Sequence, residues 1–269
     1  MTTMCRITWG AALAAALSVT LAAQQAPTGY HSISCVKVKP GKNADFATLI
    51  NGDVRKLEQS RVDSGAIAGW IALRTIMPAG LDAPCDYAVV TFYNGLPNAP
   101  LTGDELAAAL KKAGVTATLD EWQEEHAAVG TLVYDNITQY QTLVGEAKEG
   151  DYLVFNSMSV PDVDAWIAYE NKVWKPLAEA MVKDGVEDGW ALNVQIFPTG
   201  AKDRSLESTV DIFPSWDAFL QADQHYMEHW KTVHPDLAAD DALAQFNKLC
   251  TIESTVLYKV EIVITSMHQ

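Results

Sequence analysis

Histidines and aromatic residues are concentrated in one short segment near the end of the chain. His225 and His229 are four residues apart, with Glu228 between them and Trp230 directly after. Residues at this spacing lie on the same face of a helix. Because a neutral imidazole is a suitable general base near neutral pH, His225 and His229 are the predicted catalytic residues if the chain is an enzyme.

The same segment has the form His-x-x-Glu-His, in which two histidines can bind zinc and the glutamate can activate water. Enzymes with this pattern take a further carboxylate ligand from much farther downstream, whereas the chain ends at residue 269. A pattern of three fixed residues also recurs by chance. We therefore predict no metal site. An amphipathic helix, in which Trp230 packs and most histidines meet solvent, stays open as the alternative to catalysis.

The remaining histidines show no such pairing. His234 precedes a proline and is expected to end its helix. His126 follows two glutamates, which favour its charged form on a solvated face. His31 and His268 are expected to be exposed.

Four residues elsewhere are candidates for contact with a small molecule. Trp190, together with Trp230, is a candidate aromatic wall of a pocket. Asn193 and Gln195 share one face of a predicted strand and either line a polar pocket or face water. Arg74 needs a carboxylate or an acidic ligand if its side chain points inward, but no partner at the rim of the fold, which we favour.

The composition excludes several classes of function. The chain has 269 residues, 34 acidic and 19 basic, and a formal net charge of -15. This charge argues against binding of nucleic acid or of an anionic lipid surface. The sequence also lacks the phosphate-binding loop of NTPases, the glycine-rich dinucleotide fingerprint and the serine-hydrolase elbow.

Residues 1–23 have the layout of a secretory signal peptide. Arg6 is their only charged residue, an apolar run rich in alanine follows, and small residues close it. We predict that this segment is cleaved and that the mature chain is periplasmic or secreted, without a membrane anchor.

Three cysteines remain after this cleavage, Cys35, Cys85 and Cys250. An oxidising compartment permits a disulfide, and an odd number leaves at least one thiol outside it. The sequence does not decide which two pair, and buried thiols that act as small apolar residues are the favoured interpretation.

The chain carries an internal repeat with an offset of 120 residues. Residues 62–70 resemble residues 182–190, and both segments end in Gly-Trp. The match continues without a gap from 41–94 against 161–214 and includes shared Gly, Pro and Trp residues. We predict a tandem duplication, with repeat one at 28–146, repeat two at 150–266 and a polar linker around 145–151.

Each repeat shows the element order β-α-β-β-α-β. In repeat one, alternating and apolar patterns predict strands at 31–38, 70–77, 87–93 and 131–144, with helical segments at 43–57, 104–113 and 119–129. In repeat two they predict strands at 152–159, 190–197, 208–213 and 255–264, with helical segments at 215–233 and 236–249. The first helix of repeat two is predicted from the apolar residues Trp166, Val173, Leu177 and Met181. Pro176 predicts a kink or a restart in the first helix of repeat two.

This order is the ferredoxin-like split βαβ motif, in which helices cover one face of the sheet. The uncovered face needs a partner, so the predicted fold class is α+β, with two ferredoxin-like repeats packed sheet to sheet as an intramolecular pseudo-dimer. At the level of architecture, the chain resembles the dimeric α–β barrel superfamily in fused form. That superfamily includes cofactor-independent monooxygenases of the antibiotic-biosynthesis type and haem-handling proteins.

Two functions follow from these observations. The first is an exported small-molecule-binding barrel whose ligand is apolar or aromatic and lies between sheet and helices. The alternative is an enzyme of the cofactor-independent monooxygenase or haem-handling kind, which the resemblance implies, with its site in repeat two. The sequence specifies neither a cofactor nor the oligomeric state.

Overall fold

A computed structural model describes residues 29–80, 83–97, 99–199 and 206–265. The predicted signal peptide and His268 lie outside these ranges. The first half of the chain contains β1 (Tyr30–Val38), α1 (Asn43–Leu49), the π-helix η1 (Ile50–Val54), α2 (Arg55–Asp63), β2 (Gly69–Met77), β3 (Tyr87–Tyr93), α3 (Gly103–Lys112), α4 (Leu119–Val129) and β4 (Gly130–Gly145). The second half contains β5 (Tyr152–Ser159), α5 (Val163–Lys183), β6 (Gly189–Phe197), β7 (Leu206–Phe213), α6 (Trp216–Leu220), α7 (Ala222–Val233), α8 (Ala239–Leu249) and β8 (Thr251–Thr265).

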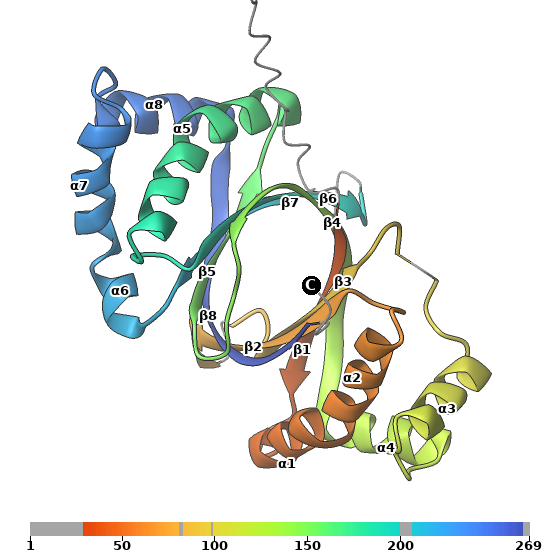
Figure 1. Cartoon of the computed structure of the whole chain (residues 1–269). Helices are drawn as coiled ribbons and strands as arrows, with labels where there is room; N and C mark the ends of the chain where they lie inside the picture. The colour runs from red at the N-terminus through yellow and green to blue at the C-terminus, as the bar shows by residue number, and fades with distance from the viewer. Residues whose placement is uncertain (1–28, 81–82, 98, 200–205, 266–269) are drawn as a thin grey trace, which may run out of the picture.

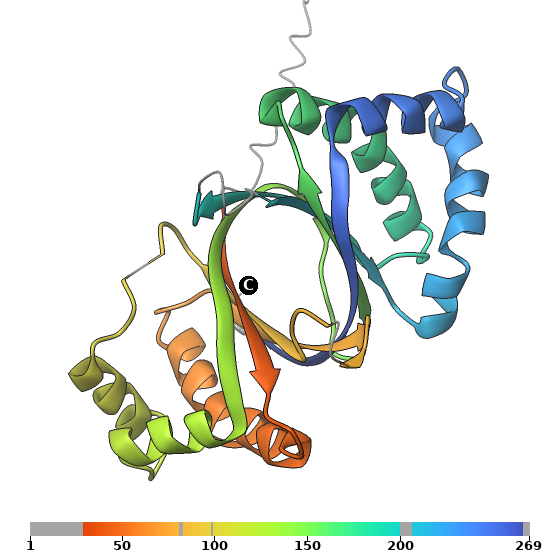
Figure 2. The same cartoon turned by 180° about the vertical axis from the view of Figure 1, so that it is seen from behind.

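The eight strands form one closed antiparallel barrel with the order β1-β3-β2-β8-β5-β7-β6-β4. Helices α1–α4 lie on one side of the barrel and α5–α8 on the opposite side (Figures 1 and 2). The predicted α+β class is thereby confirmed. The two predicted sheets do not remain separate layers, because their edges join into a single barrel.

Each half of the chain contributes four neighbouring strands to the barrel. The first half has the order β4-β1-β3-β2 and the second half the order β8-β5-β7-β6, so both halves use their strands in the same order. Two seams join the halves. At one seam β2 pairs with β8, and at the other β4 pairs with β6.

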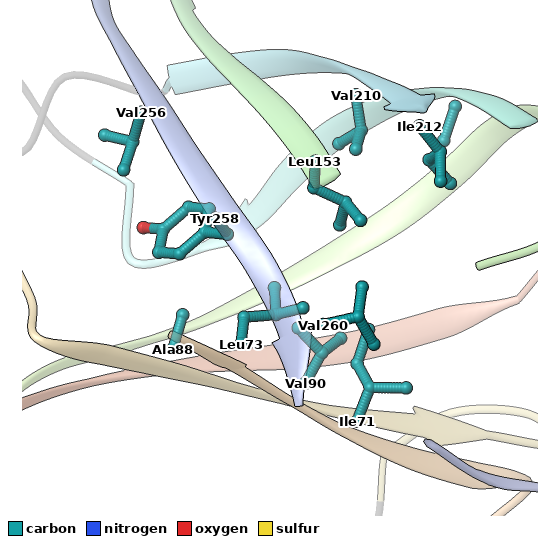
Figure 3. Close-up of a cluster of buried hydrophobic side chains, with 11 residues drawn as sticks. Ile71, Leu73, Ala88, Val90, Leu153, Val210, Ile212, Val256, Tyr258 and Val260 are labelled. Carbon is teal, nitrogen blue, oxygen red and sulfur yellow. The ribbon is translucent and has the colours of Figure 1, made fainter. Parts of the chain in front are cut away.

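The barrel interior is apolar over most of its length. Inward-facing side chains alternate along the strands with outward-facing ones, as the pleat of a strand requires. Figure 3 shows this interior cluster. Its buried members come from six strands and are Ile71, Leu73, Ala88, Val90, Leu153, Ala191, Val210, Ile212, Val256, Tyr258 and Val260.

Apolar layers on the outer face of the barrel hold the helices in place. Trp70 on β2 packs against Phe46 and Ile50 of the first half. Trp190 on β6 packs against Trp166 of α5 and Phe246 of α8. Both tryptophans begin the second strand of their half and face the helices, so each anchors a helical layer.

Two helical segments differ from the predicted ones. The segment predicted at 215–233 is divided at Gln221 into α6 and α7. Helix α5 is continuous through Pro176, where a kink or restart was predicted. A proline leaves the carbonyl group four residues earlier without its helical donor. That residue is Lys172, which is exposed, so water can satisfy the carbonyl group.

Cys35 and Cys85 form a disulfide, whereas Cys250 is buried and free. The structure thus shows which two cysteines pair, which the sequence left open. The favoured interpretation, buried thiols that act as small apolar residues, was wrong for Cys35 and Cys85.

Among the described helices, none combines the length and the hydropathy that a membrane-spanning segment needs.

Candidate functional site

A cavity of about 460 Å³ lies between the barrel and the helices of the second half. Its floor is the outer face of β5, β6 and β7, and its walls are α5, α7 and α8, which lie together at one side of the barrel (Figure 1). A pocket of this size, mostly apolar with a few convergent polar groups, is a common form of small-molecule site.

Aromatic side chains from four elements form the apolar part of this pocket. Trp174 lies edge-on to Trp230, with ring centroids 5.6 Å apart, and edge-on to Phe246 at 6.2 Å. Trp190 lines the cavity from β6. The indole nitrogen of Trp230 donates to the carbonyl oxygen of Leu237 at 2.7 Å, which fixes that ring. The aromatic walls are therefore held in place by packing and by one hydrogen bond.

Two buried carboxyl groups enter the same pocket. Glu170 of α5 is 1% exposed, and its Oε1 atom has no hydrogen-bond partner among the described residues. Asp211 of β7 accepts from Asn156 Nδ2 at 3.2 Å and from the hydroxyl group of Tyr226 at 3.4 Å. Buried polar groups usually have partners, so the open Oε1 atom needs an explanation.

A third buried carboxyl group adjoins the pocket through Tyr226. The Tyr226 hydroxyl donates to Glu187 Oε1 at 2.6 Å, while Glu187 Oε2 has no partner within the described part of the chain. Glu187 is 1% exposed and lies just before β6. Tyr226 of α7 thus lies between Glu187 and Asp211.

Burial changes the acidity of all these groups. It raises the pKa of Glu170 to about 8, and the nearby charge of Asp211 adds to the rise. Burial likewise raises the pKa of Glu187 and of Asp211 above the usual range of a carboxyl group. At neutral pH, Glu170 is therefore mainly protonated. Strongly shifted acids in a pocket are a recognised mark of functional sites.

Trp190 and Trp230, both predicted as ligand contacts, line this pocket. His225 and His229 do not. His229 Nδ1 donates to the carbonyl oxygen of His225 at 2.9 Å, and its Nε2 lies 3.0 Å from Asp184 Oδ2. His225 Nδ1 lies 3.4 Å from Glu228 Oε2. Both histidines lie on α7, and their side chains contact the carboxyl groups of Glu228 and Asp184 outside the cavity. Their catalytic role stays a prediction.

Asn193 and Gln195 face the barrel interior, on the side away from the aromatic pocket. Gln195 lines a second cavity, of about 360 Å³, and its side chain contacts Asn136 Nδ2 and the carbonyl oxygen of Pro198. Asn193 is buried and bonds Ser208. Gln195 therefore belongs to a different cavity from Trp190 and Trp230, and Asn193 lines neither of these two cavities.

Arg74 lies at the seam between β2 and β8. Its Nε donates to Glu261 Oε1 at 2.7 Å, and its side chain is 42% exposed. The structure thus places Arg74 away from both cavities, at a half-exposed position on the barrel surface.

Two other histidines differ from their expected surroundings. His31 is buried and stacks on Tyr140, with Nε2 2.6 Å from Thr138 Oγ1, and burial lowers its pKa to about 3. His126 packs on Trp122, and burial lowers its pKa, although charged residues surround it in sequence. The expected exposure of His31 was wrong, and His126 is half-buried where a solvated face was expected, because aromatic neighbours that are distant in sequence or one helical turn away cover these rings.

The prediction did not include Glu170, Glu187, Asp211 or Tyr226. A signal for the three acids was present in the repeat itself. The residues 120 positions earlier are Ile50, Ile67 and Thr91, which are all buried and of which the two isoleucines are apolar. Acidic residues where the first half has buried isoleucines are a difference between the halves that can be read from the sequence.

No protein-family model and no curated protein matches this chain. Solved structures do. One is a candidate monooxygenase from Fusobacterium nucleatum, with 12% identity and a TM-score of 0.55 over 88% of this chain and 94% of the other. Another is a candidate monooxygenase from Lactobacillus acidophilus, with 11% identity and a TM-score of 0.54 over 89% and 97%. This chain has the same α–β barrel fold. Identities this low show the fold and not the reaction.

Proposed function

We propose that the chain is an exported small-molecule-binding α–β barrel protein whose ligand occupies the aromatic pocket of the second half. The observation that carries this proposal is a 460 Å³ cavity with fixed tryptophan walls and a buried, unpartnered glutamate oxygen. Pockets with this combination bury most of a small ligand and orient it by few polar contacts.

Export and duplication are parts of the same proposal. The apolar, alanine-rich start of the chain supports a signal peptide, and the Cys35–Cys85 disulfide suits an oxidising compartment. The shared strand order of the two halves supports a tandem pair of ferredoxin-like repeats, closed into an intramolecular pseudo-dimer.

A second candidate is an enzyme of the cofactor-independent monooxygenase type. It is favoured by the names of the two similar structures and by Glu170, whose pKa of about 8 suits proton transfer near neutral pH. Turnover of a bound ligand, abolished by Glu170→Gln, would distinguish this enzyme from a binding protein.

Haem does not fit the residues of this pocket. Haem carries two carboxylates and takes an axial ligand such as histidine. Among the described residues that line the cavity there is no histidine, lysine or arginine, and the ionisable ones are acidic or phenolic. We therefore assign no haem chemistry to this site.

A pocket-filling substitution tests the proposed function. Ala178 lines the cavity from α5 and is 3% exposed, so Ala178→Phe places a ring inside the pocket. We expect this change to weaken binding of the neutral fluorescent probe N-phenyl-1-naphthylamine at least tenfold, because the ring occupies the space the probe needs.

Glu179→Phe, at the exposed neighbouring position of the same helix, is the matched control and should leave probe binding unchanged. If Ala178→Phe does not fold, Leu243→Trp at the half-exposed mouth of the pocket replaces it. Unchanged probe binding in a folded pocket variant would show that this cavity is not the site.

A further inference from the structure

The ionisable side chains that line the aromatic pocket, among the described residues, are all acidic or phenolic. Glu170, Asp211, Asp223 and Asp240 line it, together with the phenol of Tyr226. Within the described lining there is no basic side chain to neutralise them. A buried carboxylate is stable only when a positive charge or several hydrogen-bond donors accompany it. The Trp166 indole lowers the pKa of Glu170 only in part, so a positive charge has to come from the ligand.

Glu170 shows where such a ligand would bind. Its Oε1 atom is fully buried, has no partner among the described residues and belongs to a side chain that lines the cavity. Leaving a buried acceptor unsatisfied costs about 1–3 kcal/mol. An N–H donor of a ligand would satisfy this oxygen, and a positive charge there would favour the ionised form of Glu170 beside Asp211.

The aromatic walls favour the same kind of group. Trp174, Trp190 and Trp230 line the same cavity as Glu170, from α5, β6 and α7. A cation near the face of an aromatic ring, and above all of a tryptophan, is attracted by the electrons of that ring. Pockets that combine several aromatic rings with acidic groups are a known solution for binding organic ammonium groups.

We propose that the ligand of this pocket is an organic amine, with a protonated nitrogen held by Glu170 and Asp211 and an apolar body held by the tryptophan walls. This inference rests on the proposed function, because it names the ligand class of the same site.

The ionisable groups near Glu170 determine how binding of a cation depends on pH. Tyr169, Asp211 and Cys250 interact with Glu170 itself, and Glu187 and Tyr226 interact with Asp211. None of them is a base that gains a positive charge near neutral pH. A cation should therefore drive proton release from Glu170, and its affinity should rise with pH up to about 8.

Three matched compounds test the inference on the full mature protein. They are 4-phenylbutylamine, 4-phenyl-1-butanol and 5-phenylpentanoate, which share an apolar body and differ in charge. By isothermal titration calorimetry at pH 7, we expect the amine to bind at least tenfold more tightly than the alcohol, and the carboxylate most weakly. Titration in two buffers of different ionisation enthalpy should show proton release with the amine and none with the alcohol.

Two variants assign the effect to the carboxyl groups. Glu170→Gln keeps the shape of the side chain and should lower the amine affinity at least tenfold, end proton release and remove the preference for the amine over the alcohol. Glu179→Gln, exposed on the same helix, is the control and should change nothing. Asp211→Asn is the second variant if Glu170→Gln does not fold.

The possible failures are distinguishable. If the alcohol binds as tightly as the amine, or if neither variant affects the amine, the amine inference is wrong while the proposed binding site stands. If none of the three compounds binds and Ala178→Phe does not affect binding of the neutral probe, both the inference and the proposed function are overturned.

Discussion

Glu170 is a carboxyl group surrounded by apolar side chains on a helix that is otherwise packed like a core helix. Trp166 and Trp174 lie one helical turn before and after it, and Val173 and Leu177 are buried on the same helix. Burial disfavours the charged form, which raises the pKa to about 8. The residue therefore keeps a proton at neutral pH that a solvated glutamate would have lost.

This retained proton makes the stability of the protein depend on pH. Between about pH 4.5 and pH 8, the folded state holds one more proton at Glu170 than the unfolded chain does. The free energy of unfolding should therefore fall as pH rises through this window, by up to about 1.4 kcal/mol per pH unit from this group. Glu170→Gln should remove that contribution, as urea denaturation at pH 5, 6, 7 and 8 would measure.

Glu179→Gln provides the comparison for this slope, since Glu179 is exposed on the same helix and pairs with Lys175 at 3.7 Å. Its pH profile should follow that of the unmodified protein. A profile of Glu170→Gln that is parallel to the unmodified one would show that Glu170 titrates normally in the folded state.

At the scale of elements, the helices α3 and α4 begin in the same way. Thr102 and Thr118 precede them, and each forms a capping box with a glutamate three residues later. In the second of these, the Thr118 hydroxyl accepts from Glu121 N at 3.3 Å, while Thr118 N donates to Glu121 Oε2 at 2.8 Å. Each capping box joins residues only three positions apart, so the sequence next to each helix determines where that helix begins.

Removal of one cap should destabilise the protein by a modest, defined amount. Thr118→Ala leaves the first backbone N–H groups of α4 without the hydroxyl acceptor and should lower the free energy of unfolding by about 1 kcal/mol. Thr118→Ser keeps the acceptor and should cost much less. Equal losses for alanine and serine in chemical denaturation would contradict a capping role.

At the scale of the whole molecule, the barrel depends on two seams between strands that are far apart in sequence. At the seam of β4 and β6, Gly145 lies opposite Gly189, and their backbones approach closely. A Cβ atom on Gly145 would overlap the carbonyl oxygen of Asp188, and Gly145 also has a φ of 66°. Only glycine combines that backbone conformation with so close an approach.

A substitution at this seam tests barrel closure. Gly145→Ala should destabilise the protein by about 2–4 kcal/mol, because it adds overlap at the seam to the cost of a left-handed backbone. Gly41→Ala is the control, since Gly41 has a φ of 76° and open space around its Cβ position, and it should cost about 1–2 kcal/mol. Equal losses at both positions would show that close packing at the seam contributes nothing.

The amino-acid sequence by itself determined the order of the elements and most of their positions. Periodicity, turn residues and caps act over a few residues, so the strands at 87–93 and 152–159 and the helix at 119–129 coincide with β3, β5 and α4. Trp190 and Trp230, which the sequence nominated as ligand contacts, line the pocket, and their contact with a ligand stays a prediction.

Only the tertiary structure decided which distant groups meet. The disulfide, the two seams and the cluster of Glu170, Asp211 and Tyr226 join residues that no local pattern connects. The tertiary structure also decided which histidines are buried. It placed the side chains of Trp190 and Asn193 on opposite faces of β6. Burial, and with it the acidity of Glu170, depends on neighbours supplied by other elements, and the protein acquires these only when the barrel closes and the helices pack against it.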